Sequence, residues 1–188
     1  MKVLTTELPD LLVVEPTVHR DARGFFLETW RESRYRDHGI DARFVQDNHS
    51  RSQRGTLRGL HAQLAPEPMA KLVRCVAGAV FDVAVDLRRG SPGYGRWVGF
   101  ELSGENFRQV YLPGGFAHGF CVLSDTAEVE YKCSEVYCPE HEIVIAWNDP
   151  RIGIRWPVQD PVLSPRDREA PPLSDWARQG RLPPFVPR

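Results

Sequence analysis

Two histidines stand in sequence contexts that suit acid–base chemistry. His61 lies in the run Arg58–Gln63, and His118 lies in a run over 114–120 that is rich in glycine and phenylalanine. Imidazole is the side chain best suited to accept a proton near neutral pH. A histidine in a strand is more commonly a hydrogen-bonded core group, so the residues alone leave both interpretations open. The other four histidines lie in segments typical of surfaces or turns: His19, His38, His49 and His141.

A lysine and a tyrosine extend this set of candidate groups. Lys71 interrupts an apolar, strand-like run that starts at Ala70. A lysine that points into a protein interior is costly unless it meets an anion or a developing negative charge. The alternative is an edge strand with Lys71 facing water. Tyr131 lies on the apolar side of its run, where a phenol is either a core group or a proton donor with an ordinary pKa of about 10.

The spacing of the histidines does not favour a metal site. Iron, manganese and zinc sites in all-β proteins combine two or three histidines with a carboxylate at close spacing. Neither His61 nor His118 has another histidine two or four residues away. We therefore expect no bound metal.

Alternation of apolar and polar residues predicts the strands that must position these groups. Every second residue of the run 81–87 is apolar, and Val129, Tyr131 and Cys133 share the apolar side of the run 128–133. Such alternation is typical of half-buried strands. Turn-forming clusters rich in glycine, proline and serine separate these runs between about 70 and 148. The pattern predicts an all-β fold, an antiparallel sandwich or barrel.

Helices are expected only in two short segments, over 32–38 and 173–179, each ending before a glycine. From residue 157 onward the chain carries eight prolines. We expect this segment, about 157–188, to wrap the barrel as an irregular arm within a single domain over 1–188. The length of 188 residues corresponds to about one domain.

The composition excludes several classes of function. A net charge of -1 provides no general field for nucleic acid or an anionic membrane. No apolar run approaches the roughly 20 residues of a membrane-spanning helix, and the first residues contain no secretory signal pattern. The cysteines form no Cys-x-x-Cys pair, which favours reduced, buried thiols in a cytoplasmic protein. They are Cys75, Cys121, Cys133 and Cys138.

Several motifs that follow one another in order carry a family resemblance over about three-quarters of the chain. They are Asp21-x-Arg23-Gly24-x-Phe26, Gln46–Ser50, Arg58–His61, Lys71–Val73, Phe81–Arg88, Pro113–Phe120, Tyr131-Lys132, Trp147–Pro150 and Ser164–Asp167. With these motifs the chain closely resembles the dTDP-4-dehydrorhamnose 3,5-epimerases, which have a cupin-like jelly-roll fold. The resemblance implies inversion of C3 and C5 of dTDP-4-keto-6-deoxyglucose to give dTDP-4-keto-L-rhamnose, without a metal or organic cofactor.

The resemblance also implies roles for the candidate groups. His61 would remove a proton alpha to the C4 ketone, and Asp167 would orient and charge its imidazole. Lys71 would stabilise the enolate oxygen, and Tyr131 would return a proton from the opposite face. Asp82 would be a further partner of His61 or Lys71.

Substrate contacts and assembly follow from the same resemblance. Guanidinium groups pair well with phosphate oxygens, although the alternative for these charges is solvated surface pairing. The implied contacts are Arg23, Arg58 and His118 for phosphate or sugar, Glu28, Gln46 and Asn48 for the nucleoside, and Asp47, Glu142 and Arg166 at further binding positions. The family implies a homodimer that exchanges N-terminal strands, with Arg23 and Glu28 placed in trans to His61.

Two departures from the family pattern leave alternatives open. Ala62 stands where many relatives have tyrosine, and the segment Pro66–Ala70 replaces a common Gln-Gly pair. We expect both changes to lie beside the reactive sugar. The alternatives are a C3-only or C5-only epimerase, a ketoisomerase, and a catalytically silent module that binds a sugar nucleotide.

Overall fold

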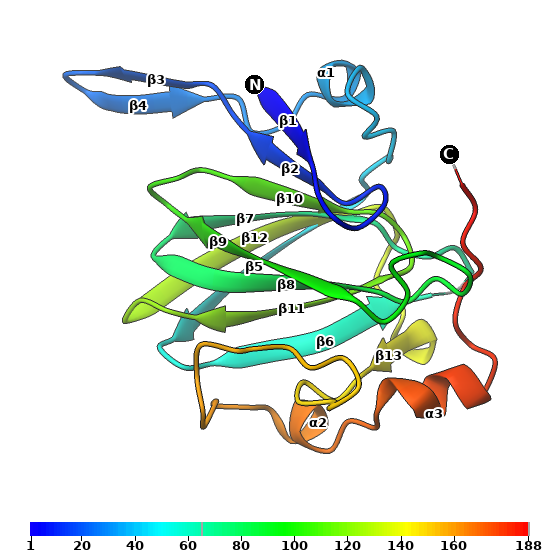
Figure 1. Ribbon diagram of the computed structural model, residues 1–188. Helices are drawn as coiled ribbons and strands as arrows, with labels where there is room; N and C mark the ends of the chain where they lie inside the picture. The colour runs from blue at the N-terminus through cyan, green and yellow to red at the C-terminus, as the bar shows by residue number, and fades with distance from the viewer. Residues whose placement is uncertain (65, 188) are drawn as a thin grey trace.

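Two antiparallel sheets face each other in the computed structural model, which describes residues 1–64 and 66–187 (Figure 1). The six-stranded sheet has the order β1 (Lys2–Thr5), β2 (Leu12–Glu15), β10 (Gln109–Leu112), β7 (Lys71–Ala77), β12 (Thr126–Cys133) and β5 (Gln46–Gln53). The five-stranded sheet has the order β13 (Glu142–Val144), β6 (Leu57–Gln63), β11 (Phe116–Val122), β8 (Ala79–Asp86) and β9 (Trp97–Ser103). The prediction of an all-β fold is confirmed.

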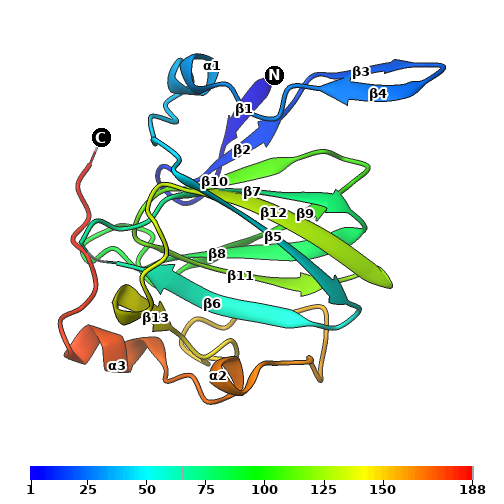
Figure 2. The ribbon, with the colours of Figure 1, turned by 180° about the vertical axis from the view of Figure 1, so that it is seen from behind.

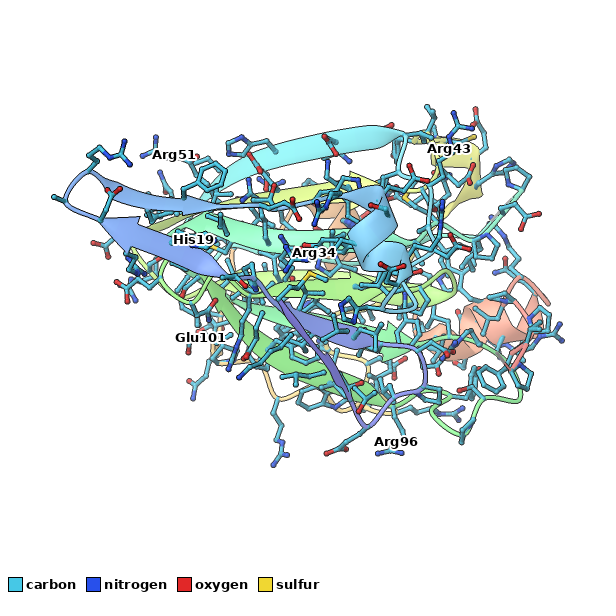
Figure 3. The ribbon with its side chains drawn as sticks, turned by 90° about the horizontal axis from the view of Figure 1, so that it is seen from above. His19, Arg34, Arg43, Arg51, Arg96 and Glu101 are labelled. Carbon is cyan, nitrogen blue, oxygen red and sulfur yellow. The ribbon has the colours of Figure 1, made fainter. Side chains whose placement is uncertain are left out.

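A separate hairpin near the N-terminus lies outside both sheets. It consists of β3 (Val18–Asp21) and β4 (Gly24–Leu27) and extends past the ends of the sheets (Figure 2). Two phenylalanines near its turn, Phe25 and Phe26, are 56% and 72% exposed. The hairpin is followed by α1 (Glu32–Arg36), which carries Arg34 and lies over the outer face of the six-stranded sheet (Figure 3).

The main core fills the space between the sheets, because the alternate residues of each strand point inward. Val73 and Val129 from the six-stranded sheet meet Leu102 and Phe120 from the five-stranded sheet. A second apolar cluster lies on the outer face of the five-stranded sheet. There the chain after β13, with α2 (Pro165–Arg168) and α3 (Leu173–Arg178), covers the strands (Figures 1 and 2).

Of the four short helical elements in the described residues, two were predicted from the sequence. The helices expected over 32–38 and 173–179 are confirmed as α1 and α3. The 3-10 turn at Pro139–His141 and the single turn of α2 were not predicted. Ser164 starts α2, since its hydroxyl accepts a hydrogen bond from the backbone N–H of Asp167 at 3.1 Å. None of the described helices is long and apolar enough to cross a membrane.

Candidate active site

An irregularity in β6 brings Arg58 and His61 to the same face of the sheet. His61 lies opposite His118 and Arg58 opposite Phe120, so three steps on β6 match two on β11. Without this register shift, residues three apart would face opposite sides. Gly59 allows the distortion: it has φ 126°, and a Cβ there would lie 2.6 Å from the Cα of Gly119. Both polar side chains therefore point into the space between the sheets.

The imidazole of His61 is held by a carboxylate from α2. His61 Nε2 and Asp167 Oδ1 are 2.6 Å apart, across 106 residues of sequence. Burial raises the pKa of Asp167. The hydrogen bond with His61 and the charge of its imidazole lower this pKa by more, so it lies below its usual range. Because an ionised carboxylate only accepts hydrogen bonds, the neutral form of the imidazole has its proton on Nε2 and its lone pair on Nδ1. His61 is thus arranged to act as a base through Nδ1.

Lys71 and Tyr131 lie on the facing sheet. The ammonium of Lys71 is 5.8 Å from the centre of the Tyr131 ring, and among the described residues no carboxylate lies within ion-pair distance of it. Burial lowers the pKa of Lys71, although Cys133, Glu142 and Asp82 act in the opposite direction. Burial also raises the pKa of Tyr131, so its phenol stays protonated. The lysine is therefore placed to gain from a nearby negative charge.

These groups surround one small cavity of about 80 Å³. His61 enters from β6 of the five-stranded sheet, whereas Lys71 and Tyr131 enter from β7 and β12 of the six-stranded sheet. A ligand between the sheets would therefore have the imidazole on one side and the phenol on the other. The remaining wall is formed by Gln46, Asn48, Gln63, Met69, Cys133, Tyr137 and Glu142.

The expected role of Asp82 beside His61 is corrected by the structure. Asp82 Oδ2 lies 2.7 Å from Nε2 of His118, and both side chains are buried. The reason is strand order: β8 is next to β11, whereas β6 lies on the far side of β11. The ring of His118 is in turn 6.3 Å from that of Tyr131. A second imidazole–carboxylate pair thus lies beside the one formed by His61.

Gln46, Asn48 and Glu142 of the predicted binding residues line the cavity, whereas Arg58 and Arg166 do not. Gln46 donates from Nε2 to Oδ1 of Asn48 at 3.0 Å, and Arg58 donates from Nε to the hydroxyl of Ser52 at 3.0 Å. Glu142 forms an ion pair with Arg166. Burial lowers the pKa of Arg166, but its hydrogen bonds to Tyr137 and Glu142 and the charge of Glu142 raise it overall.

Three other predicted binding residues lie away from this group within the chain. Asp47 points to the outer face of its sheet, where Lys132 lies 2.9 Å away. Arg23 is on the projecting hairpin and pairs with Asp21 at 2.5 Å. Glu28 pairs with arginines in and beside α1. Their roles remain predictions.

The two departures from the family pattern separate in the structure. Met69 does line the cavity, but Ala62 does not. Ala62 is 2% exposed and packs in the outer cluster with Leu60 and Ile143, on the opposite face of β6 from His61. The expectation that Ala62 lies beside the sugar is therefore wrong, because neighbouring residues of a strand face opposite sides.

Three cavity residues, Gln63, Cys133 and Tyr137, were missed from the sequence, where Cys133 was expected only as a buried thiol. Gln63 lies two residues after His61, and the period of a strand was a signal that it shares the face of His61. Tyr137 comes from an irregular segment, where no periodicity could have marked it. Within 1–64 and 66–187 no three histidine, cysteine, aspartate or glutamate side chains cluster in a way that could hold a metal ion.

Known proteins match the chain over nearly its whole length. The family described as dTDP-4-dehydrorhamnose 3,5-epimerase matches residues 5–175. The dTDP-4-dehydrorhamnose 3,5-epimerase of Shigella flexneri is 55% identical over 168 residues, which cover 89% of this chain and 93% of that protein.

Solved structures agree with this match. The Legionella pneumophila dTDP-6-deoxy-D-glucose-3,5-epimerase RmlC, in complex with dTDP-4-keto-L-rhamnose, is 49% identical with a TM-score of 0.93 and covers 98% of both chains. A 3'-monoepimerase from Streptomyces bikiniensis, in complex with dTDP-quinovose, is 39% identical with a TM-score of 0.90 and covers 95% of this chain and 91% of that one.

Fold and matches together define an epimerase of nucleotide sugars with a cupin-like fold. The chain belongs to the dTDP-4-dehydrorhamnose 3,5-epimerase family, as the sequence motifs predicted. It has dTDP-4-dehydrorhamnose 3,5-epimerase activity.

Proposed function

We propose that His61 is the base of this reaction, Tyr131 the acid, Lys71 the group that stabilises the enolate, and Asp167 the residue that orients His61. The observation that supports these roles is that His61 and Tyr131 line one cavity from opposite sheets. Epimerisation requires removal of a proton from one face of a carbon and its return to the other. A base and an acid on opposite walls meet that requirement without movement of the protein.

The substrate of this proposal is dTDP-4-keto-6-deoxyglucose, and the product is dTDP-4-keto-L-rhamnose. C3 and C5 both flank the C4 ketone, so the C–H bond of each is acidified by it. His61 Nδ1 takes the proton, and the electron pair moves onto the C4 oxygen, where the ammonium of Lys71 stabilises the negative charge. Tyr131 then gives its proton to the carbon from the other wall. Exchange with water returns His61 and Tyr131 to their starting protonation states.

The same proposal assigns the rest of the ligand to the binding residues predicted from the sequence, of which Gln46, Asn48 and Glu142 line the cavity. Arg58 and His118 would contact the sugar or the diphosphate, and guanidinium suits phosphate oxygens. The other contacts proposed within the chain are Gln46, Asn48, Asp47, Glu142 and Arg166.

The reaction uses no metal or organic cofactor, so dialysis against a chelator should leave turnover unchanged. Three of the four thiols, those of Cys75, Cys121 and Cys133, are buried, whereas Cys138 is half-buried; free thiols fit a reducing, cytoplasmic environment.

We further infer a homodimer in which N-terminal strands are exchanged and the β3–β4 hairpin reaches the cavity of the partner. The exposed phenylalanines of the hairpin and the side chain of Arg23, 90% exposed, support this inference. Light scattering at micromolar concentration should give the mass of two chains. Mixing the inactive variants Arg23→Ala and His61→Ala should restore activity, because one site of each mixed dimer is intact. A monomer, or no restored activity, would contradict shared sites.

Exchange of substrate protons with solvent tests the catalytic roles. Incubation with dTDP-4-keto-6-deoxyglucose in D₂O, followed by NMR of the sugar, should show deuterium at both C3 and C5. In His61→Ala both signals should build up about 10²–10⁴ times more slowly, the usual contribution of a positioned base. His38→Ala, in an exposed turn, is the matched control and should behave like the wild type. Deuterium at one carbon would indicate a mono-epimerase, and no exchange at all a silent binding module.

A further inference from the structure

One edge of the cavity is formed by a short segment that lacks packing of its own. It consists of Val136, Tyr137 and Cys138, between β12 and β13. Val136 is 67% exposed and Tyr137 is 49% exposed. Side chains this exposed contribute little buried area to hold a segment in place. Within the chain, its position therefore depends on hydrogen bonds.

Two glutamines supply those hydrogen bonds, one from each sheet. Gln63 of β6 donates from Nε2 to the carbonyl of Val136 at 3.1 Å, and its Oε1 accepts from the backbone N–H of Cys138 at 2.8 Å. Gln46 of β5 accepts from the backbone N–H of Tyr137 at 2.9 Å. Gln63 is only 4% exposed, so water cannot easily replace these bonds.

The segment in turn holds groups that face the ligand. The hydroxyl of Tyr137 donates to Oε2 of Glu142 at 3.0 Å, and Glu142 pairs with Arg166. Arg166 is the neighbour of Asp167, which holds His61. The position of the segment is thus linked to the charged rim on one side of the cavity.

The size of the cavity explains why this rim matters for binding. A volume of about 80 Å³ is well below the roughly 300–1,000 Å³ of pockets that enclose a drug-sized ligand. Most of a nucleotide diphosphate sugar must therefore lie outside the cavity, along its mouth. A mouth that is already in place avoids the entropy cost of ordering it on binding.

We propose that Gln63 is a positioning residue, which holds the segment 136–138 so that Tyr137 and Glu142 form a preordered mouth for the nucleotide part of the ligand. The inference rests on the proposed function for the identity of the ligand. It assigns to Gln63 an effect on affinity through the backbone of another segment, and no part in proton transfer.

The variant Gln63→Met tests this, because methionine has a similar length and removes both hydrogen bonds. Two lost hydrogen bonds correspond to about a tenfold weaker equilibrium affinity for dTDP by calorimetry. KM should rise by a similar factor, kcat should stay within about twofold, and the backbone amide of Cys138 should exchange with solvent faster. The control Gln53→Ala replaces an exposed glutamine at the end of β5 and should change none of these quantities.

Other outcomes would overturn the proposal. A fall in kcat with unchanged protection of Cys138 would show that Gln63 acts on the sugar itself. If Gln63→Met does not fold, the wild type provides the second measurement: the amides of Tyr137 and Cys138 must be protected without ligand, and exchange at the rate of an unstructured chain would refute a preordered mouth. Because dTDP affinity and amide exchange need no turnover, failure of the epimerase mechanism would be seen separately in the D₂O experiment.

Discussion

Arg88 and Lys71 are two cationic side chains that lie largely out of solvent, and their charges have different surroundings. Arg88 pairs with Asp86 at 2.9 Å and with Asp10 at 2.7 Å, and it is 6% exposed. Its guanidinium also lies 4.6 Å from the ring of Phe116. The ammonium of Lys71 lies 5.8 Å from the centre of the Tyr131 ring, and among the described residues no carboxylate lies within ion-pair distance of it. The charge of Arg88 is therefore paired within the protein, whereas the charge of Lys71 is available to interact with a ligand.

The surroundings of Arg88 connect distant parts of the chain. The backbone carbonyl of Pro9 accepts a hydrogen bond from Arg88 at 2.8 Å, and the ring of Phe185 lies 4.8 Å from the guanidinium. Asp86 also accepts a hydrogen bond from the hydroxyl of Ser91 at 2.6 Å. The cluster therefore joins both ends of the chain to β8. A buried charge that is fully paired maintains the folded structure, whereas a buried charge without an ion-pair partner is typical of functional sites.

Removal of Arg88 should have the largest effect on stability. Arg88→Met leaves Asp86 buried without its partner, and we expect a loss of about 3–5 kcal/mol in the free energy of unfolding, measured by urea titration. Arg96→Met is the control, since this arginine is exposed and 3.3 Å from Glu7, and it should cost at most about 1 kcal/mol. Equal losses of stability in the two variants would show that the buried ion pairs of Arg88 stabilise the fold no more than an exposed pair does.

Removal of Lys71 should affect catalysis and spare the fold. We expect Lys71→Met to lower kcat by about 10²–10³, the usual contribution of one group that stabilises an oxyanion. Because the fold lowers the pKa of Lys71, it disfavours the charged form, and the urea midpoint should stay the same or rise. A loss of stability like that of Arg88→Met, with kcat preserved, would show that Lys71, like Arg88, stabilises the fold.

An uncharged buried position provides a baseline for both variants. Ala62→Leu adds volume to the packed outer cluster of the five-stranded sheet, and we expect a loss of about 1–3 kcal/mol in the free energy of unfolding. The ratio of deuterium at C3 and C5 should remain that of the wild type, because Ala62 faces away from His61. A changed ratio in the NMR experiment would mean that the two faces of β6 are coupled.

The pH dependence should show the smallest effect and would sharpen the assignment of Lys71. The pKa of Lys71 lies below that of an ordinary lysine, about 10.4, so the ammonium loses its proton as pH rises through this lowered value. We expect kcat to fall on the alkaline side for that reason. Tyr131 does not account for the fall, since its pKa is raised. In Lys71→Arg the guanidinium stays charged, and the relative alkaline decline should move to higher pH. An unmoved decline would assign the titration to another group.

Local patterns in the sequence predicted the parts of the fold that local physics determines. Alternation located β8 and β12 to within about two residues of their observed bounds, because a strand that is buried on one side must repeat with period two. The same alternation already separates His61 from Ala62. The expectation that both face the sugar was wrong because it relied on closeness along the chain.

Contacts that depend on strand order could not be predicted in this way. Asp82 meets His118 because β8 and β11 are neighbours, and no local pattern encodes that order. The family motifs did place Asp167 with His61, and the structure shows their contact. Nothing in the sequence around Arg88 pointed to its partners, since Asp10 and Phe185 come from near the two ends of the chain.

The location of Asp167 has a consequence for the order in which a newly made chain becomes active. All strands of both sheets precede residue 145, whereas Asp167 belongs to the covering segment that follows them. A domain generally folds as a unit. A nascent chain that ends before residue 167 therefore contains every strand around the cavity but lacks the carboxylate that orients His61. Such a chain has neither the oriented base nor the full cover of the outer apolar face.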